Sequence, residues 1–124
     1  MVVPRSRVPE LIERVELIGE RNKTFVVNFG HAGDGNIHVN YMCDRDDPDA
    51  VHRARTAVRE TFEVAVELGG TISGEHGIGY VKAPYLNIAL DEATIRAMRK
   101  IKAALDPKGI LNPGKMFMVN GTEI

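Results

Sequence analysis

The sequence contains little of what marks secreted, membrane-spanning or nucleic-acid-binding proteins. Cys43 is its only cysteine, so the chain can form neither an internal disulfide nor a cysteine-rich metal site, which fits a reducing cytoplasm. The 16 basic and 17 acidic residues are spread along the chain, and no block of one sign indicates a nucleic acid partner. The longest apolar runs cover only a few residues, far fewer than a membrane span needs. We therefore expect a cytoplasmic protein with no nucleic acid partner and no transmembrane segment.

The first half of the chain has the pattern of a helix followed by a hairpin. Apolar residues at helical spacing predict a helix over residues 8–21. β-branched, aromatic and alternating residues predict strands over 24–29 and 37–42. The glycine-rich segment between them, residues 33–36, predicts a tight turn. The two strands should therefore pair as an antiparallel hairpin.

The second half of the chain predicts two more helices and a short strand. Asp47 and Pro48 are typical of a helix start, and this helix should end at the glycine pair 69–70. Residues 71–73 predict a short strand. Asp91 should cap a last helix with four inward-facing apolar residues, Ile95, Met98, Ile101 and Leu105. Together these elements predict an α+β fold, an antiparallel sheet with helices packed on one face.

Two histidines flank the predicted turn. If residues 32–37 form the loop, His31 and His38 lie directly opposite each other, with Cβ atoms about 4.5–5.5 Å apart. That separation suits two imidazoles that bind one ion, because zinc–nitrogen bonds are about 2.0–2.1 Å long. Asn40 falls on the same strand face as His38. Its amide is placed to bind a hydroxyl or carboxylate of a substrate.

A carboxylate and a third histidine follow the predicted short strand, in a glycine-rich loop. Two histidines and Glu75 form a ligand set that leaves open positions for water or substrate, as zinc, manganese or ferrous sites do. His76, next to Glu75, is then available as a general base, because histidine exchanges protons near neutral pH. The residue pattern by itself predicts a metal site with a nearby base.

Each of these residues also has an ordinary interpretation. A single histidine in a hairpin is usually a surface or core residue, and GDGN runs and loop glutamates are common without any ligand. His52 is expected on the solvated face of a helix. Four aromatic residues are expected in the hydrophobic core, with a position at the wall of a pocket as the alternative: Phe25, Phe29, Tyr41 and Tyr80.

Three segments resemble one protein family in the order expected. HAGDGNIHVN (residues 31–40), GGTISGEHGIGYVKAPYL (69–86) and LDPKGILNPGKMF (105–117) are similar to motifs of the C-terminal domain of FAD-linked oxidases. This family includes the FAD-binding subunit of glycolate oxidase, D-lactate dehydrogenase and D-2-hydroxyglutarate dehydrogenase. The opening stretch, residues 2–15, is also similar, so the resemblance covers essentially the whole chain.

The resemblance implies a specific role for each candidate residue. His31, His38 and Glu75 would bind a divalent metal, expected to be zinc, manganese or iron. Asn40 would contact a 2-hydroxy-acid substrate, and His76 would be the catalytic base that deprotonates its 2-hydroxyl. The metal would act as Lewis acid and template while hydride passes to the flavin, so that a 2-oxo acid forms.

The resemblance also implies that residues 1–124 are a ferredoxin-like fragment of a cap domain that binds substrate. Asn112 would lie where the closing segment approaches the FAD cofactor. The FAD-binding domain is expected to be absent from this chain, because no glycine-rich pyrophosphate loop lies between a strand and a helix. The expected partners are therefore an FAD-binding domain or subunit, or a second copy in a homodimer that pairs at an exposed sheet edge. We expect the isolated chain to be inactive, and the full enzyme to be cytoplasmic or peripheral at the membrane.

Two other functions fit the residues. A stand-alone metal-binding module, such as a sensor or metal hydrolase, would use the same histidines and glutamate without redox chemistry. A non-catalytic assembly subunit would carry the motifs without using them.

Overall fold

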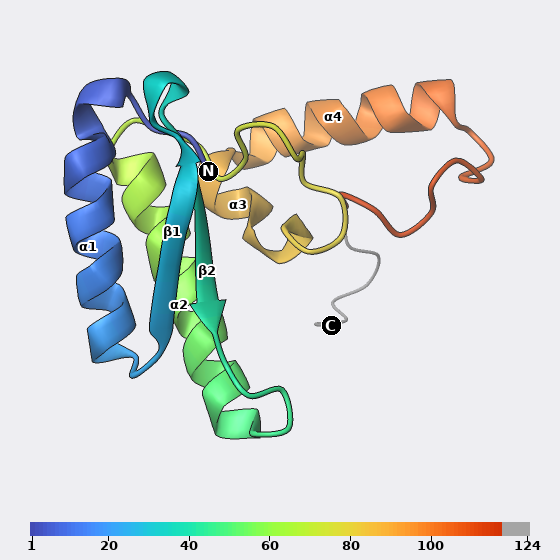
Figure 1. Ribbon diagram of the computed structural model, residues 1–124. Coiled ribbons are helices and arrows are strands. Elements are labelled where there is room, and N and C mark those ends of the chain that lie inside the picture. The colour runs from blue at the N-terminus through green and yellow to red at the C-terminus, as the bar shows by residue number, and fades with distance from the viewer. Residues whose placement is uncertain (118–124) are drawn as a thin grey trace. The chain divides into compact units, whose positions relative to one another are not determined.

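The computed structural model describes residues 1–117 (Figure 1). The chain divides into two compact units, Met1–Glu75 and His76–Ile124, and each unit is described by itself. The last seven residues of the predicted 1–124 domain fragment, 118–124, lie outside the described residues. Within the described part, no helix combines the length and the apolar character that a membrane crossing requires.

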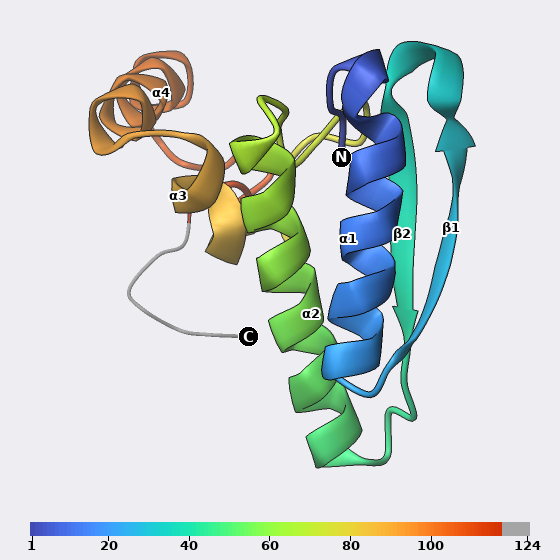
Figure 2. The ribbon, with the colours of Figure 1, turned by 90° about the vertical axis from the view of Figure 1, so that its left-hand side faces the viewer.

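The first unit has two layers, a pair of helices and an antiparallel hairpin. The two long helices lie side by side on one face of the strands (Figure 2). This arrangement confirms the predicted α+β fold with helices on one face of an antiparallel sheet. In chain order the elements are the short 3-10 helix η1 (Arg5–Arg7), α1 (Val8–Arg21), β1 (Phe25–His31), the 3-10 turn η2 (Ala32–Asp34), β2 (Asn36–Met42) and α2 (Pro48–Glu67).

Both long helices begin where the sequence predicts. α1 starts at Val8 with a proline in its first turn, a position where the missing N–H of proline costs nothing. The side chain of Asp47 caps α2 by accepting a hydrogen bond from the backbone N–H of Asp49 (2.9 Å), which satisfies one of the donors left over in a first helical turn. Local sequence therefore determines where each helix starts.

The sheet is wider than the hairpin at one end. Val2 forms antiparallel bridges with Asn36 of β2 on one side and with Thr71 on the other. The lateral order is therefore β1, β2, Val2, Thr71. With α1 between Val2 and β1, and α2 between β2 and Thr71, the chain follows the β-α-β-β-α-β order of ferredoxin-like folds. The strand predicted over 71–73 is reduced to this single bridge.

The hydrophobic core lies between the helices and the inner face of the sheet. Tyr41 joins both layers, because its hydroxyl lies 2.6 Å from Oγ1 of Thr61 in α2 and 3.4 Å from the carbonyl oxygen of Val15 in α1. Full burial of an aliphatic side chain contributes about 1.5–3 kcal/mol. Nine buried residues form the core cluster: Val3, Leu11, Val15, Ile18, Ile37, Ala57, Val64, Ala65 and Leu68.

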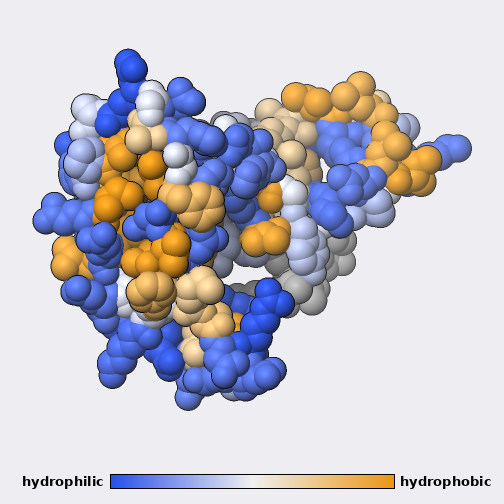
Figure 3. Space-filling model, in the orientation of Figure 1, coloured by the Kyte–Doolittle hydropathy of each residue, from blue (hydrophilic) through white to orange (hydrophobic). Residues whose placement is uncertain are grey.

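The outer face of the sheet is not covered by the first unit's helices. Strand alternation directs every second residue of β1 and β2 away from the core. Four of these outward residues are exposed apolar side chains, Phe25, Val27, Phe29 and Met42. They form apolar surface over the two strands (Figure 3). The predicted metal ligands His31 and His38 lie on this same outer face.

Helices joined by turns make up the described part of the second unit. It contains η3 (Ala83–Tyr85), α3 (Leu86–Ala89) and α4 (Glu92–Leu105). Asp91 caps α4 as predicted, since its side chain accepts from the backbone N–H of Thr94 (2.7 Å). The expectation that Ile101 and Leu105 face inward is wrong, because both are exposed. Residues 76–117 contain no strand that would form a second layer against the apolar side of α4.

The segment after α4 is organised by one carboxylate. Asp106 accepts hydrogen bonds from the backbone N–H groups of Ile110 and Leu111 (both 3.0 Å) and from the ammonium of Lys102. The same ammonium also donates to the carbonyl oxygen of Leu111 (2.7 Å). The hydrogen bond from Lys102 holds the pKa of the Asp106 carboxyl below its ordinary value. These contacts fix the turn that leads to Asn112.

Candidate metal centre

The hairpin turn is shorter than the sequence predicts. β1 continues to His31 and β2 begins at Asn36, so these two residues pair, and His38 pairs with Phe29. The expectation that His31 and His38 lie directly opposite each other is therefore wrong. The 3-10 turn over residues 32–34 and the left-handed Gly35 (φ 75°) reverse the chain quickly.

The N-terminal segment keeps the start of β2 in the sheet. The backbone N–H of Ile37 donates to the carbonyl oxygen of Met1 (2.9 Å), and that of Val3 donates to the carbonyl oxygen of Gly35 (3.0 Å). A Cβ on Gly35 would lie 2.0 Å from the Val3 carbonyl oxygen, so only glycine allows this close approach. Residues 36 and 37 therefore extend the ladder instead of forming loop.

The two histidines meet as diagonal neighbours on the outer face. His31 lies two residues beyond Phe29, the partner of His38, so both histidines project to the same side of the hairpin. Diagonal pairs remain within reach of aromatic side chains. The two imidazole centroids are 5.9 Å apart, and the ring planes meet at 79°. The corrected register therefore still brings both rings together.

Glu75 reaches the histidines because the loop before it passes close to β2. Thr71 is hydrogen-bonded to Val2 through both backbone groups (3.1 and 2.9 Å), and Ile72 is fully buried. A Cβ on Gly74 would lie 2.6 Å from Oδ1 of Asn36, so the loop can approach the strand here only without a side chain. The next residue, Glu75, is then close to the outer face.

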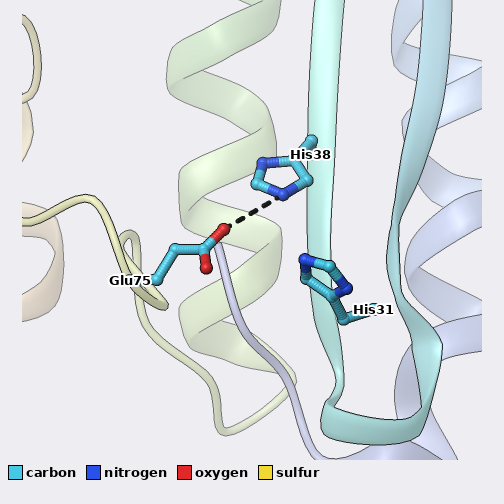
Figure 4. Close-up of side chains that lie close together, drawn as sticks. All are labelled: His31, His38 and Glu75. Carbon is cyan, nitrogen blue, oxygen red and sulfur yellow. Dashed lines mark ion pairs between the residues drawn. The ribbon is translucent and has the colours of Figure 1, made fainter.

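The three predicted ligands converge on one point (Figure 4). Nε2 of His38 lies 3.2 Å from Oε1 of Glu75. One ligand atom from each of His31, His38 and Glu75 lies within 4.8 Å of the other two. The side chain of His38 is 20% exposed and that of Glu75 is 46% exposed, so a ligand can approach from solvent.

The donor set fits a divalent metal ion. Two imidazole nitrogens and one carboxylate oxygen are ligands that zinc and similar ions accept, and three protein ligands leave further coordination positions open. Ligand atoms on a tetrahedral zinc ion are about 3.4 Å apart, given bonds of about 2.0–2.1 Å. Small side-chain rotations close the remaining distance in this cluster. Within residues 1–117, His31, His38 and Glu75 are the one group of three or more His, Cys, Asp or Glu side chains that lie close enough together to hold a metal ion.

The other predicted site residues lie in different parts of the chain. Asn40 is exposed on β2 opposite Val27, on the same face as His38 and two residues further along. His76 is exposed and begins the second unit, directly after Glu75. Asn112 is exposed in the second unit with a left-handed φ of 49°, which asparagine tolerates better than most residues. The roles of these three residues stay predictions.

Two aromatic residues expected in the core lie on the outer face of the sheet instead, and one of them, Phe29, contacts a predicted metal ligand. Phe25 and Phe29 are 72% and 59% exposed on the outer face, whereas Tyr41 packs against the core as expected. The Phe29 ring lies 5.1 Å from that of His38. Strand alternation is the sequence signal for the outward position of Phe29, because residues two apart on a strand, such as Phe29 and His31, project from the same face.

Comparison with known proteins gives consistent matches over nearly the whole chain. A family model described as "FAD linked oxidases, C-terminal domain" matches residues 1–116. The chain is 48% identical over 115 residues to the glycolate oxidase subunit GlcD of Bacillus subtilis (strain 168), covering 93% of this chain and 24% of that protein.

Two further relatives have other names. A D-lactate dehydrogenase of Anaerostipes hadrus is 39% identical over 118 residues, covering 94% of this chain and 25% of that protein. A D-2-hydroxyglutarate dehydrogenase of Stutzerimonas stutzeri (strain A1501) is 38% identical over 120 residues, covering 90% and 25%. The chain thus spans about a quarter of the length of the relatives it matches.

Proposed function

We propose that this chain, which belongs to the family of C-terminal domains of FAD-linked oxidases, is the metal- and substrate-binding part of a flavin-dependent D-2-hydroxy-acid dehydrogenase. The family assignment made from three sequence motifs is confirmed by the match over residues 1–116. The observation that carries the functional proposal is the convergence of His31, His38 and Glu75, with one ligand atom from each within 4.8 Å of the others.

His31, His38 and Glu75 hold the metal in this proposal. Bound there, a divalent ion such as zinc, manganese or iron supplies a Lewis acid and a template for the carboxylate and 2-hydroxyl of the substrate. The two imidazoles bind through ring nitrogens, and the Glu75 carboxylate offsets part of the positive charge. Three protein ligands would leave further coordination positions of such an ion for substrate or water.

Three further residues of the chain act on substrate and cofactor. Asn40, on the same strand face as His38, uses its amide to bind the substrate carboxylate or hydroxyl. An imidazole nitrogen of His76 accepts the proton of the 2-hydroxyl. Asn112 contacts the flavin. FAD, held mainly outside this chain, supplies the acceptor for the hydride of the substrate.

The partner in this proposal is an FAD-binding domain or subunit. Relatives about four times as long as this chain have ample length for such a domain, and residues 1–124 would be its cap. The exposed apolar side chains of β1 and β2 suit burial against that partner. A homodimer that pairs at the edge strand β1 is the alternative, and sedimentation at increasing concentration distinguishes the two.

We place the enzyme in the cytoplasm because of its single cysteine, with peripheral attachment to the membrane as the alternative.

Elemental analysis tests the metal site directly. The chain is incubated with zinc, manganese or ferrous ions, dialysed and analysed. We expect about one ion per wild-type chain and a loss of bound metal in His38→Ala. His52→Ala is the matched control, because His52 is exposed on α2 and does not belong to the cluster. Equal metal content in all three proteins would refute the site.

A further inference from the structure

Phe29 combines exposure to solvent with contact to a proposed metal ligand. It lies directly opposite His38 across the hairpin, and its side chain is 59% exposed. The two ring centroids are 5.1 Å apart, and the ring planes are tilted by 31°. Aromatic pairs at about 4.5–7 Å attract each other in offset or edge arrangements. Phe29 therefore stacks on the imidazole of His38.

The imidazole of His38 needs such a contact to keep its orientation. The χ2 torsion of histidine has a broad, roughly two-fold energy profile, so the backbone alone does not fix the direction of Nε2. In the structure this nitrogen lies 3.2 Å from Oε1 of Glu75. The ring of His31 meets the His38 ring edge-on, at 79°. A rotation of about 90° around χ2, away from the two-fold minima, would move Nε2 out of the cluster and would turn the imidazole plane away from the ring of Phe29.

A role in the hydrophobic core does not explain Phe29. The core cluster lies on the inner face of the sheet, and Phe29 projects from the outer face. Phe25 is a natural comparison, because it projects from the same face of the same strand and is 72% exposed. Its partner across the hairpin is Met42 and not a histidine. The two phenylalanines thus differ in what they contact.

We propose that Phe29 is a positioning residue for the metal centre: its ring holds the imidazole of His38 in the orientation that directs Nε2 toward Glu75. This role rests on the proposed metal-binding function. The energy of one aromatic pair corresponds to about a two- to tenfold change in a binding constant. Loss of the ring should weaken metal binding by that factor, because the imidazole must then be ordered at the expense of metal affinity.

The first test compares zinc dissociation constants, measured by competition with a chromophoric chelator. Phe29→Leu should bind zinc about two- to tenfold more weakly than wild type. Phe29→Tyr keeps a ring that stacks and should restore the wild-type value. Phe25→Leu is the matched control and should bind zinc as wild type does. Wild-type affinity in Phe29→Leu, or an equal loss in both leucine variants, would overturn the proposal.

The second test reads the contact between the two rings in the absence of metal. In proton NMR spectra of the metal-free chain, the His38 ring protons are identified by their loss in His38→Ala. The ring current of Phe29 should shift their resonances away from the chemical shifts of a histidine that is not stacked. Phe29→Leu should remove this difference in chemical shift. Unshifted His38 resonances in the wild-type chain would overturn the positioning role alone. A wild-type chain that binds no zinc would overturn the proposed metal site and this role together.

Discussion

Nε2 of His38 and Oε1 of Glu75 lie 3.2 Å apart, although one residue belongs to β2 and the other to the loop after α2. The sheet order makes this contact possible. Val2 bridges Asn36 of β2 on one side and Thr71 on the other. The segment that leads to Glu75 is therefore separated from β2 in the sheet only by the chain at Val2. The proximity of the three candidate ligands is therefore a product of the ferredoxin-like order of strands, and it should respond to changes in how these segments pack.

Glu75→Gln tests the carboxylate as a ligand. The amide keeps the size of the side chain but removes its negative charge. Outer-shell partners of metal ligands typically contribute about 10- to 100-fold to affinity, so the loss of a direct ligand should exceed this range. Zinc titration by calorimetry measures the effect, with Glu63→Gln on the exposed side of α2 as the control. A loss of less than tenfold would remove Glu75 from the ligand set.

Gly74→Ala tests how the loop presents Glu75. The added Cβ would lie 2.6 Å from Oδ1 and 2.8 Å from Cγ of Asn36, so the loop or the amide must move. We expect metal affinity to fall by about tenfold or more, while far-ultraviolet circular dichroism still reports the folded chain.

Gly33→Ala is the matched control for this substitution. A Cβ at that position in the hairpin turn would have no heavy atom within 4 Å, so its metal affinity should equal that of wild type. If Gly74→Ala and Gly33→Ala bind zinc equally well, the close approach of the loop to Asn36 does not position the carboxylate.

The proximity of His31, His38 and Glu75 could be predicted from sequence even though the predicted hairpin register was wrong. The predicted loop paired His31 with His38, whereas the structure pairs His31 with Asn36. This error is a shift of two residues, and an even shift keeps every side chain on its own face of the sheet. A shift of one residue would have moved one histidine into the core. The prediction therefore depended on the face of the strand and not on the exact partner.

Other features could be predicted only where local sequence determines them. The span of α1 and the caps at Asp47 and Asp91 match the prediction, because periodicity and capping are local properties. The exposure of Phe29 and Leu105 was not predicted. An apolar side chain is buried only if another layer covers it, and no local pattern specifies that layer.

The turn after α4 should depend on acid through Asp106. The hydrogen bond from Lys102 lowers the pKa of this carboxyl in the folded chain, so folding favours the deprotonated form. Its stabilising contribution is therefore complete above the ordinary pKa of aspartate, about 3.9, and is lost as pH falls through the lower folded value. The protection of the Ile110 and Leu111 amides, which donate to this carboxylate, should fall over that acidic range when their exchange is compared with the intrinsic rate at each pH.

Asp106→Asn separates this carboxylate from the rest of the acid response. The amide cannot accept from both backbone N–H groups and pair with the ammonium of Lys102, so exchange at Ile110 and Leu111 should already be fast at neutral pH. It should show no further step that tracks a carboxyl titration. Unchanged protection of these two amides in the variant would mean that Asp106 does not organise the turn.

Tyr41→Phe tests the polar connection between the two layers of the first unit. The substitution removes a hydroxyl that contacts Thr61 and the Val15 carbonyl oxygen. It should lower the free energy of unfolding, measured by urea denaturation, by about 0.5–1.5 kcal/mol.

Burial raises the pKa of Tyr41, so folding favours the neutral phenol. This contribution is complete below about pH 10 and is lost as pH rises through the higher folded value. Tyr41→Phe should lack that alkaline loss of stability, while Tyr80→Phe, in the second unit, should retain it. An unfolding free energy equal to wild type at neutral pH would mean that apolar packing alone joins the hairpin to the helices.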